Sequence, residues 1–205
     1  MKVAVVKYNA GNIRSVVNAL LRVGVQPEVT DDPARLRAAD RVIFPGQGEA
    51  YHTMACLRSS GLDAVIRSLT QPVLGICIGQ QLLCEHSDEG DTPCLGIFPG
   101  AEVRHFADMW AGAAAGAKIP HIGWNTVETS PCPLFSGIES GAYVYFIHSY
   151  CVPLSPYAVA TTEYGGVRFS SAMRRGNFYA TQFHPEKSGR VGERLLHNFI
   201  HYCHD

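Results

Sequence analysis

One stretch decides the fold: Pro72-Val73-Leu74-Gly75-Ile76-Cys77-Ile78-Gly79-Gln80-Gln81-Leu82-Leu83. It starts with a short apolar run typical of a buried strand and ends with leucines at helical spacing. Cys77 stands between Gly75 and Gly79, the pattern of a nucleophile elbow, in which a sharp strand-to-helix turn exposes a reactive side chain. We expect a strained backbone at Cys77, with Gly79 letting the helix approach the sheet closely.

The position of Cys77 indicates two possible roles. Backbone N–H groups at a helix N-terminus carry partial positive charge, which favours a thiolate and can hold an oxyanion. A free cysteine is more often a small buried apolar side chain, so the elbow alone leaves both interpretations open. A nucleophilic cysteine would also need a general base and a third group that orients the base.

The candidates for these two groups lie near the C-terminus, in Phe178-Tyr179-Ala180-Thr181-Gln182-Phe183-His184-Pro185-Glu186-Lys187. His184 and Glu186 follow an expected strand and are separated by a proline that fixes the local chain direction. Both side chains can then project from one turn toward the end of the sheet where the elbow points. We therefore predict that Cys77, His184 and Glu186 act together.

Alternating apolar patterns predict an α/β fold with an open, mostly parallel sheet flanked by helices, of the flavodoxin-like kind. In the first part of the chain we expect strands over residues 3–8, 27–30 and 41–44, with helices over 14–23, after Asp32 and over 54–69. Shorter strands over 95–98, 102–106, 126–128, 143–148 and 159–163 predict a mixed or antiparallel extension. A helix over 191–202 closes the chain, and residues 107–117, which show no period, are expected to form a surface loop or short helix.

Composition limits the possible functions. The chain has 205 residues, 46% hydrophobic and 17% charged, with a net charge of −1, which favours a single domain over residues 1–205 and argues against nucleic-acid binding. No apolar run approaches the roughly 18 residues of a membrane helix. Seven cysteines without a CxxC pair indicate reduced thiols in the cytoplasm, so we expect no metal site and no cofactor.

A glycine loop, Pro45-Gly46-Gln47-Gly48-Glu49, follows the expected strand at 41–44. Open parallel sheets bind ligands at this end of their strands. The loop lacks the GxGxxG and Walker spacings, so a nucleotide site is the weaker interpretation. We expect it to aim a backbone N–H group at Cys77.

These motifs resemble those of the class I glutamine amidotransferases. The resemblance rests on Gly75–Leu83 together with Thr181-Gln182-Phe183-His184-Pro185-Glu186. Further segments narrow it to the glutaminase subunits of imidazole glycerol phosphate synthases: Tyr8-Asn9-Ala10-Gly11-Asn12-Ile13-Arg14-Ser15-Val16, Lys118-Ile119-Pro120-His121-Ile122-Gly123-Trp124-Asn125, Tyr145-Phe146-Ile147-His148-Ser149-Tyr150 and Lys187-Ser188-Gly189. The likeness spans residues 2 to about 199.

The resemblance implies that the chain is one glutamine amidotransferase type 1 domain that hydrolyses glutamine to glutamate and ammonia. A separate (β/α)8-barrel cyclase subunit would use the ammonia to make imidazole glycerol phosphate in histidine biosynthesis. Cys77 would form the glutamyl thioester, His184 would move the proton and Glu186 would orient His184. The remaining roles are implied in the same way: oxyanion binding by the backbone of Gly46, Gln47 and Ile78, glutamine binding by Gln81, Glu89, Ser149 and Tyr150, and contact with the cyclase by Asn12, Trp124, Asn125 and Lys187.

Two positions depart from the family pattern, and three other functions remain open. Gln47 replaces a small aliphatic residue and Gln80 replaces a common methionine. Only the backbone of residue 47 is expected to act, so the chemistry should be unchanged. The alternatives are an amidotransferase subunit for another acceptor, such as a surface sugar, a non-catalytic binding or regulatory module of the same fold, and a cysteine hydrolase of the peptidase type.

Overall fold

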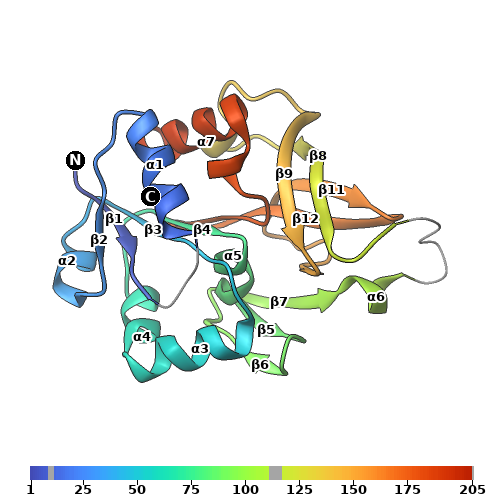
Figure 1. The fold of residues 1–205 in the computed structure, drawn as a ribbon, viewed down its shortest axis with the longest axis horizontal. Helices are drawn as coiled ribbons and strands as arrows, with labels where there is room; N and C mark the ends of the chain where they lie inside the picture. Colours follow the sequence, from blue (N-terminus) through green and yellow to red (C-terminus); the bar gives the residue numbers. More distant parts are fainter. Residues whose placement is uncertain (9–11, 111–116, 205) are drawn as a thin grey trace.

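The computed structural model describes residues 1–8, 12–110 and 117–204. Figure 1 shows a central sheet with helices on both sides and a smaller sheet beneath it. The elements are, in order, β1 (Val3–Val6), α1 (Ile13–Arg22), β2 (Glu28–Thr30), α2 (Pro33–Arg37), β3 (Arg41–Phe44), α3 (Ala50–Ser59), α4 (Leu62–Arg67), β4 (Val73–Ile76), α5 (Ile78–Leu83), β5 (Cys84–Ser87), β6 (Thr92–Pro93), β7 (Phe98–His105), α6 (Phe106–Met109), β8 (His121–Thr129), η1 (Pro133–Phe135), β9 (Ala142–His148), β10 (Tyr150–Cys151), β11 (Ala158–Tyr164), β12 (Val167–Arg175), β13 (Phe178–Thr181), η2 (Pro185–Lys187) and α7 (Gly189–His201).

The main sheet has two halves. Its nine strands run in the order β2-β1-β3-β4-β13-β12-β11-β8-β9. The neighbours from β2 to β13 pair in parallel, and those from β13 to β9 pair antiparallel. This arrangement confirms the predicted α/β sheet with its antiparallel extension, and β13 is the strand at which the two halves meet.

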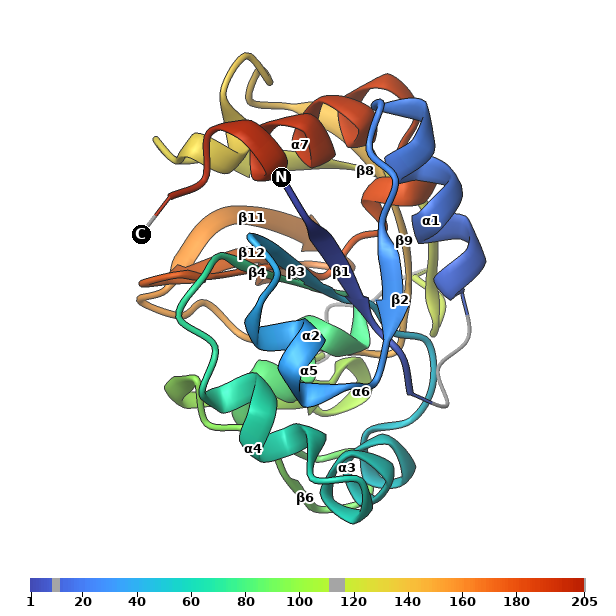
Figure 2. The same cartoon turned by 90° about the vertical axis from the view of Figure 1, so that its left-hand side faces the viewer.

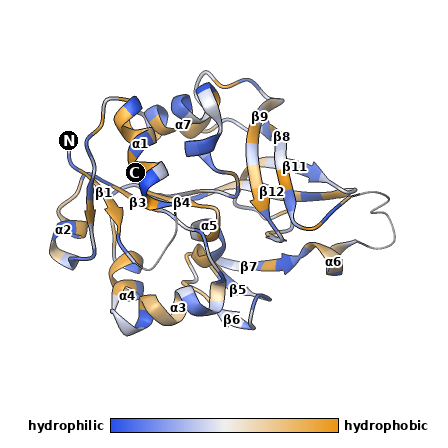
Figure 3. Cartoon of the chain, viewed as in Figure 1, coloured by the Kyte–Doolittle hydropathy of each residue, from blue (hydrophilic) through white to orange (hydrophobic). Residues whose placement is uncertain are grey.

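Helices cover both faces of the sheet (Figure 2). One hydrophobic core lies beneath α1 and α7 and includes Leu20, Leu195 and Phe199. A second core lies toward α3, α4 and the smaller sheet, which has the order β10-β7-β5-β6, and it includes Met54 and Phe98. In Figure 3 the strands β1 and β3, which lie between the helices, are largely hydrophobic.

Local sequence explains the helices that position the site. In α1, Val16, Ala19 and Leu20 are buried at helical spacing. In α7, four apolar side chains at helical spacing are fully buried: Leu195, Leu196, Phe199 and Ile200. Helix α2 begins as expected after Asp32, whose carboxylate accepts a 2.8 Å hydrogen bond from the backbone of Ala34.

Several predicted elements were wrong in part. The helix expected over 54–69 is two helices, because Gly61 between α3 and α4 takes a φ of 71° and ends the regular spiral. Residues 95–97 are outside any strand, and strands β5 and β12 were not predicted. Of the segment 107–117, residues 107–109 belong to α6, whereas 111–116 lie outside the described residues, as do 9–11 of the turn before α1. No described helix could span a membrane.

Candidate active site

Cys77 occupies the turn between β4 and α5, as the elbow pattern predicts. Its backbone has φ 54° and ψ −107°, a conformation that a residue with a side chain rarely adopts. A Cβ on Gly79 would lie 2.4 Å from the Phe44 carbonyl oxygen, and one on Gly75 would lie 2.9 Å from the Gly79 backbone. Glycine is therefore required at both positions, because only then can α5 pack directly on β3 and β4.

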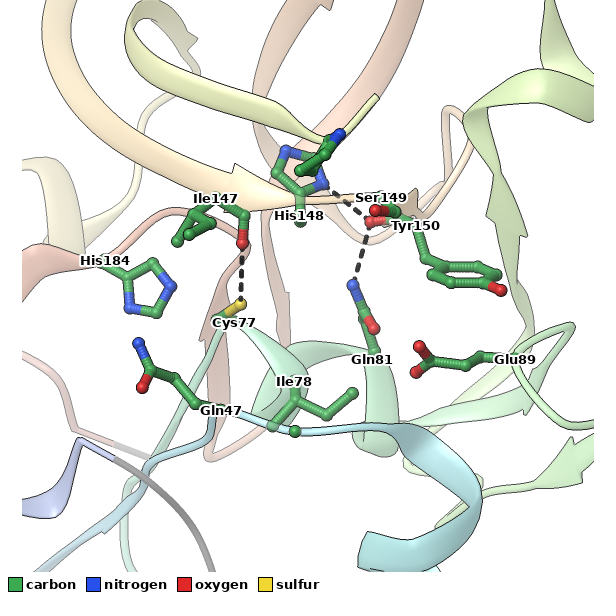
Figure 4. Close-up of a pocket in the computed structure, with 12 residues that line it drawn as sticks. Gln47, Cys77, Ile78, Gln81, Glu89, Ile147, His148, Ser149, Tyr150 and His184 are labelled. Atoms are coloured by element: carbon green, nitrogen blue, oxygen red, sulfur yellow. Dashed lines mark hydrogen bonds between the residues drawn. The ribbon is translucent and has the colours of Figure 1, made fainter. Parts of the chain in front are cut away.

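His184 and Glu186 lie together in the short η2 turn that follows β13. His184 Nδ1 is 2.7 Å from Glu186 Oε1, and both side chains are fully buried. Because a carboxylate only accepts, Nδ1 carries a proton and Nε2 is the nitrogen left for the cysteine. Among the described residues Nε2 has no hydrogen-bond partner, and Figure 4 shows the His184 ring beside the Cys77 sulfur.

The surroundings of His184 change its pKa. Burial alone would lower it, but the negative charge of Cys77, together with the hydrogen bond and charge of Glu186, raises it to about 10. His184 is then protonated at neutral pH when Cys77 is a thiolate. His184 is therefore suited to act as the base for a cysteine nucleophile.

Three contacts hold the η2 turn in place. The His184 backbone N–H donates to the Tyr145 carbonyl of β9 at 2.9 Å, and the Ser188 hydroxyl donates to the His184 carbonyl at 2.6 Å. The Asn12 amide donates to Glu186 Oε1. Asn12 was expected at a partner interface, and its contact with the carboxylate of the candidate triad was not foreseen.

A pocket of about 420 Å³ opens over the cysteine (Figure 4). It is lined by Cys77, His184 and all four residues predicted to bind glutamine: Gln81, Glu89, Ser149 and Tyr150. Gln47, Gly48 and Ile78 form the side nearest the glycine loop. Gly46, which was expected to help with the oxyanion, lies behind this lining, and a Cβ there would overlap the Ile78 side chain.

Two backbone donors and one carboxylate give the pocket its polarity. The N–H groups of Gln47 and Ile78 find no acceptor among the described residues. Glu89 is half-buried and accepts a 2.7 Å hydrogen bond from the backbone of Ala50, and its pKa is raised, chiefly by burial. Two lining residues next to the cysteine therefore have unpaired backbone N–H groups among the described residues, and Glu89 places an acidic group in the same lining.

Sequence reasoning missed three buried polar side chains around the pocket. Gln182 donates from Nε2 to Cys77 Sγ at 3.7 Å. His148 lines the pocket and is 3.0 Å from His121, and neither histidine was given a role. Gln182 stands two residues before His184, which was the one available signal, whereas nothing local distinguishes His148 and His121 from the other histidines.

The remaining interface candidates lie on or near the β8–β9 hairpin. Trp124 is 55% exposed and packs edge-to-face with Tyr145, their ring centroids 6.0 Å apart. Lys187 Nζ lies 5.9 Å from the centre of the same Tyr145 ring. Asn125 is half-buried, and its amide donates to the Glu163 carbonyl at 3.0 Å. Ile122, Trp124 and Tyr143 are exposed on one face of the paired strands, whereas Asn125 lies on the opposite face.

Comparisons with known proteins agree with this geometry. A family model described as glutamine amidotransferase class-I matches residues 4–203. The chain is 54% identical over 201 residues to imidazole glycerol phosphate synthase subunit HisH of Bacteroides fragilis, covering 98% of this chain and 99% of the relative. It is 52% identical over 200 residues to the same subunit of Bacteroides thetaiotaomicron, with the same coverage. A solved structure of a glutamine amidotransferase superposes with a TM-score of 0.72 at 21% identity, covering 98% of this chain and 97% of that one.

Proposed function

Since this chain belongs to the class I glutamine amidotransferases, and among them to the HisH subunits of imidazole glycerol phosphate synthase, we propose that it hydrolyses glutamine at Cys77. The observation that carries the proposal is the meeting of a strained cysteine with a buried histidine–carboxylate pair in one pocket. The ammonia released would serve a cyclase subunit in histidine biosynthesis.

The reaction follows from the charges in the pocket. His184 holds the proton of the Cys77 thiol, and the thiolate attacks the side-chain carbonyl carbon of glutamine. The carbonyl oxygen becomes an oxyanion, for which the N–H groups of Ile78 and Gln47 are the donors. As the tetrahedral intermediate collapses, the carbon–nitrogen bond breaks and His184 gives its proton to the departing ammonia. Water, deprotonated by His184, then hydrolyses the thioester to glutamate and free Cys77.

The far end of the pocket suits the amino-acid part of the substrate. Glutamine is a zwitterion there, so it needs an acidic partner for its ammonium group and donors for its carboxylate. Glu89 can pair with the ammonium group, and Gln81 and the backbone of Ser149 and Tyr150 surround the remaining space. A peptide substrate would lack the free ammonium group that Glu89 meets.

The cyclase, a (β/α)8-barrel subunit, would dock on the side of the molecule carrying Asn12, Trp124, Asn125 and Lys187. This side is coupled to the chemistry by two short paths. Tyr145 packs against Trp124 and accepts from the His184 backbone, while Asn12 donates to Glu186. Docking there can therefore adjust the catalytic histidine without entering the pocket.

The experiment is glutamate release from glutamine by the full chain, alone and with its cyclase subunit and the phosphoribulosyl substrate. We expect turnover in the complex and its loss in Cys77→Ala, with product formation from added ammonia retained. Cys56→Ala, a half-buried cysteine on α3, is the matched control and should keep glutamine turnover. Glutamine-dependent synthesis that survives Cys77→Ala would refute the proposal. Turnover that requires a different acceptor enzyme would favour an amidotransferase for another pathway.

A further inference from the structure

The Gln182 side chain touches the reacting sulfur. Its Nε2 lies 3.7 Å from Cys77 Sγ, and the residue is fully buried beneath the pocket. Its backbone N–H donates to the Ser171 carbonyl of β12 at 2.9 Å, which fixes its place in the sheet. Among the described residues, the other group within hydrogen-bond range of this sulfur is the Ile147 carbonyl, at 3.9 Å, and that group can only accept.

Gln81 determines which end of the Gln182 amide faces the cysteine. Gln81 Nε2 is 3.0 Å from Gln182 Oε1. An amide nitrogen donates and an amide oxygen accepts, so the oxygen of Gln182 is held toward Gln81. The Gln182 N–H group is thereby left pointing at the sulfur.

The orientation of Gln81 is set in turn by the Tyr150 carbonyl, on which a pair of histidines also converges. Gln81 Nε2 also donates a hydrogen bond to the Tyr150 carbonyl at 2.9 Å. The same carbonyl accepts from His148 Nδ1 at 2.7 Å (Figure 4). His148 Nε2 lies 3.0 Å from His121 Nδ1. His121 Nε2 then accepts from the Asn125 amide at 3.4 Å.

Every group in this series has a single possible role as donor or acceptor. The Asn125 amide nitrogen only donates, so His121 carries its proton on Nδ1 and donates it to His148 Nε2. The Tyr150 carbonyl accepts the proton on His148 Nδ1, so both imidazoles are neutral and each has one defined tautomer. Burial favours the neutral form and lowers the pKa of His148 to about 3 and that of His121 to about 4. The series runs without a break from Asn125, next to Trp124, to the sulfur of Cys77.

We propose that Gln182 is a catalytic residue of this glutaminase, whose side-chain N–H donates to the Cys77 thiolate, and that Gln81, held by the Tyr150 carbonyl, keeps its amide in that orientation. A hydrogen bond to an anion is stronger than one to a neutral thiol, so the contact stabilises the thiolate. The same donor stabilises the sulfur when it leaves during thioester hydrolysis. The assignment deepens the proposed function and rests on it.

The test compares two buried amides on the full chain. Gln182→Met removes the donor at similar volume. Gln80→Met is the matched control, because Gln80 is equally buried but donates to the Ser170 carbonyl at 2.9 Å and not to Cys77. Alkylation of Cys77 by iodoacetamide, located by peptide mass mapping, reports the thiolate without any glutamine turnover. We expect Gln182→Met to slow alkylation at pH 7 about tenfold and move the rate–pH curve to higher pH, whereas Gln80→Met leaves both unchanged.

A second variant keeps the test decisive if Gln182→Met folds poorly, as circular dichroism would reveal. Gln182→Glu has the same shape and still accepts from Gln81, but above neutral pH it presents a carboxylate to the sulfur. We expect alkylation at pH 8 to be slower than in Gln182→Met. Folded variants that alkylate at the parent rate would overturn the role of Gln182. That result is distinct from failure of the glutaminase itself, which would appear as absent turnover in the unmodified complex.

Discussion

His184 and His148 are both buried residues that line the same pocket, and they differ in charge. His184 follows β13, where the parallel half of the sheet ends, and its pKa is raised to about 10. His148 ends β9 in the antiparallel half, and its pKa is lowered to about 3, chiefly by burial. The same side chain therefore gives one wall of the pocket a cation and the other wall a neutral donor.

The partners of each ring cause this difference. His184 has the carboxylate of Glu186 on Nδ1 and the sulfur of Cys77 nearby, and both favour the protonated ring. His148 has a carbonyl oxygen on one nitrogen and the His121 ring on the other, so no negative charge offsets the cost of burial. Proton transfer is thus confined to one wall, and the opposite wall fixes geometry.

The largest effect should come from removing the charge that distinguishes the two walls. Glu186→Gln leaves His184 without an anionic acceptor, so the ring loses its orientation and its stabilised cation. We expect kcat for glutamine hydrolysis to fall about 10³- to 10⁴-fold, measured as glutamate release in the cyclase complex. Glu193 of α7 is an exposed carboxylate that pairs with Arg22 of α1, and Glu193→Gln should leave kcat unchanged. A loss below tenfold in Glu186→Gln would mean that the carboxylate does not control His184.

The neutral state of His148 should affect how the free energy of unfolding depends on pH. Between the ordinary pKa of 6.5 and about 3, the unfolded chain binds a proton at residue 148 that the folded chain excludes. The free energy of unfolding should therefore fall as pH falls below about 6.5, by up to about 1.4 kcal/mol per pH unit for this residue. Urea unfolding at pH 4 to 7 measures the slope.

The controls for that slope use one buried and one exposed histidine. His148→Gln should flatten the acid side of the profile, and the remaining slope should come partly from His121, whose pKa is lowered to about 4. His52→Gln replaces a side chain that is 81% exposed and should leave the profile unchanged. An unaltered slope in His148→Gln would contradict a neutral, buried His148.

A smaller effect is expected at the contact between α7 and the η2 turn, which carries His184 and Glu186. A Cβ on Gly192 would lie 1.8 Å from the Pro185 carbonyl oxygen of η2, so Gly192→Ala must displace the turn that carries His184 and Glu186. We expect a loss of about 1–3 kcal/mol in the free energy of unfolding, together with reduced kcat. Arg190→Ala, an exposed substitution at the start of the same helix, is the control. Full activity in a stably folded Gly192→Ala would show that η2 can move without consequence.

The smallest effect should come from the outer contact of Glu186. Asn12 has a φ of 71°, which glycine adopts without strain, so Asn12→Gly removes the amide and preserves the backbone. Losing one hydrogen bond to the carboxylate should lower kcat about three- to tenfold, measured at saturating cyclase so that docking is not limiting. Asn18→Gly in the exposed part of α1 controls for a general loss of helix stability. An effect on cyclase affinity alone would assign Asn12 to the interface and not to Glu186.

Sequence patterns predicted the side of the pocket that carries His184 and Glu186 better than the side that carries His148. The elbow and the His184–Pro185–Glu186 turn are local motifs, because a strained cysteine needs flanking glycines and a carboxylate two residues from a histidine can reach it. His121 and His148 are 27 residues apart and meet only because β8 and β9 pair in register. The break at Gly61 and the strands β5 and β12 were missed for a related reason, since their sequences carry no clear periodic signal.

The sequence by itself determined the α/β architecture, the position of the nucleophile and the family to which the chain belongs, because each depends on short-range patterns of apolar residues, glycines and motif residues. Only the tertiary structure decided which polar side chains surround the cysteine. Gln182 reaches Cys77 because β13 lies beside β4, and Gln81 meets Tyr150 because α5 faces the end of β9. Hydrogen bonds between distant segments depend on strand order and register, which residue spacing along the chain does not encode.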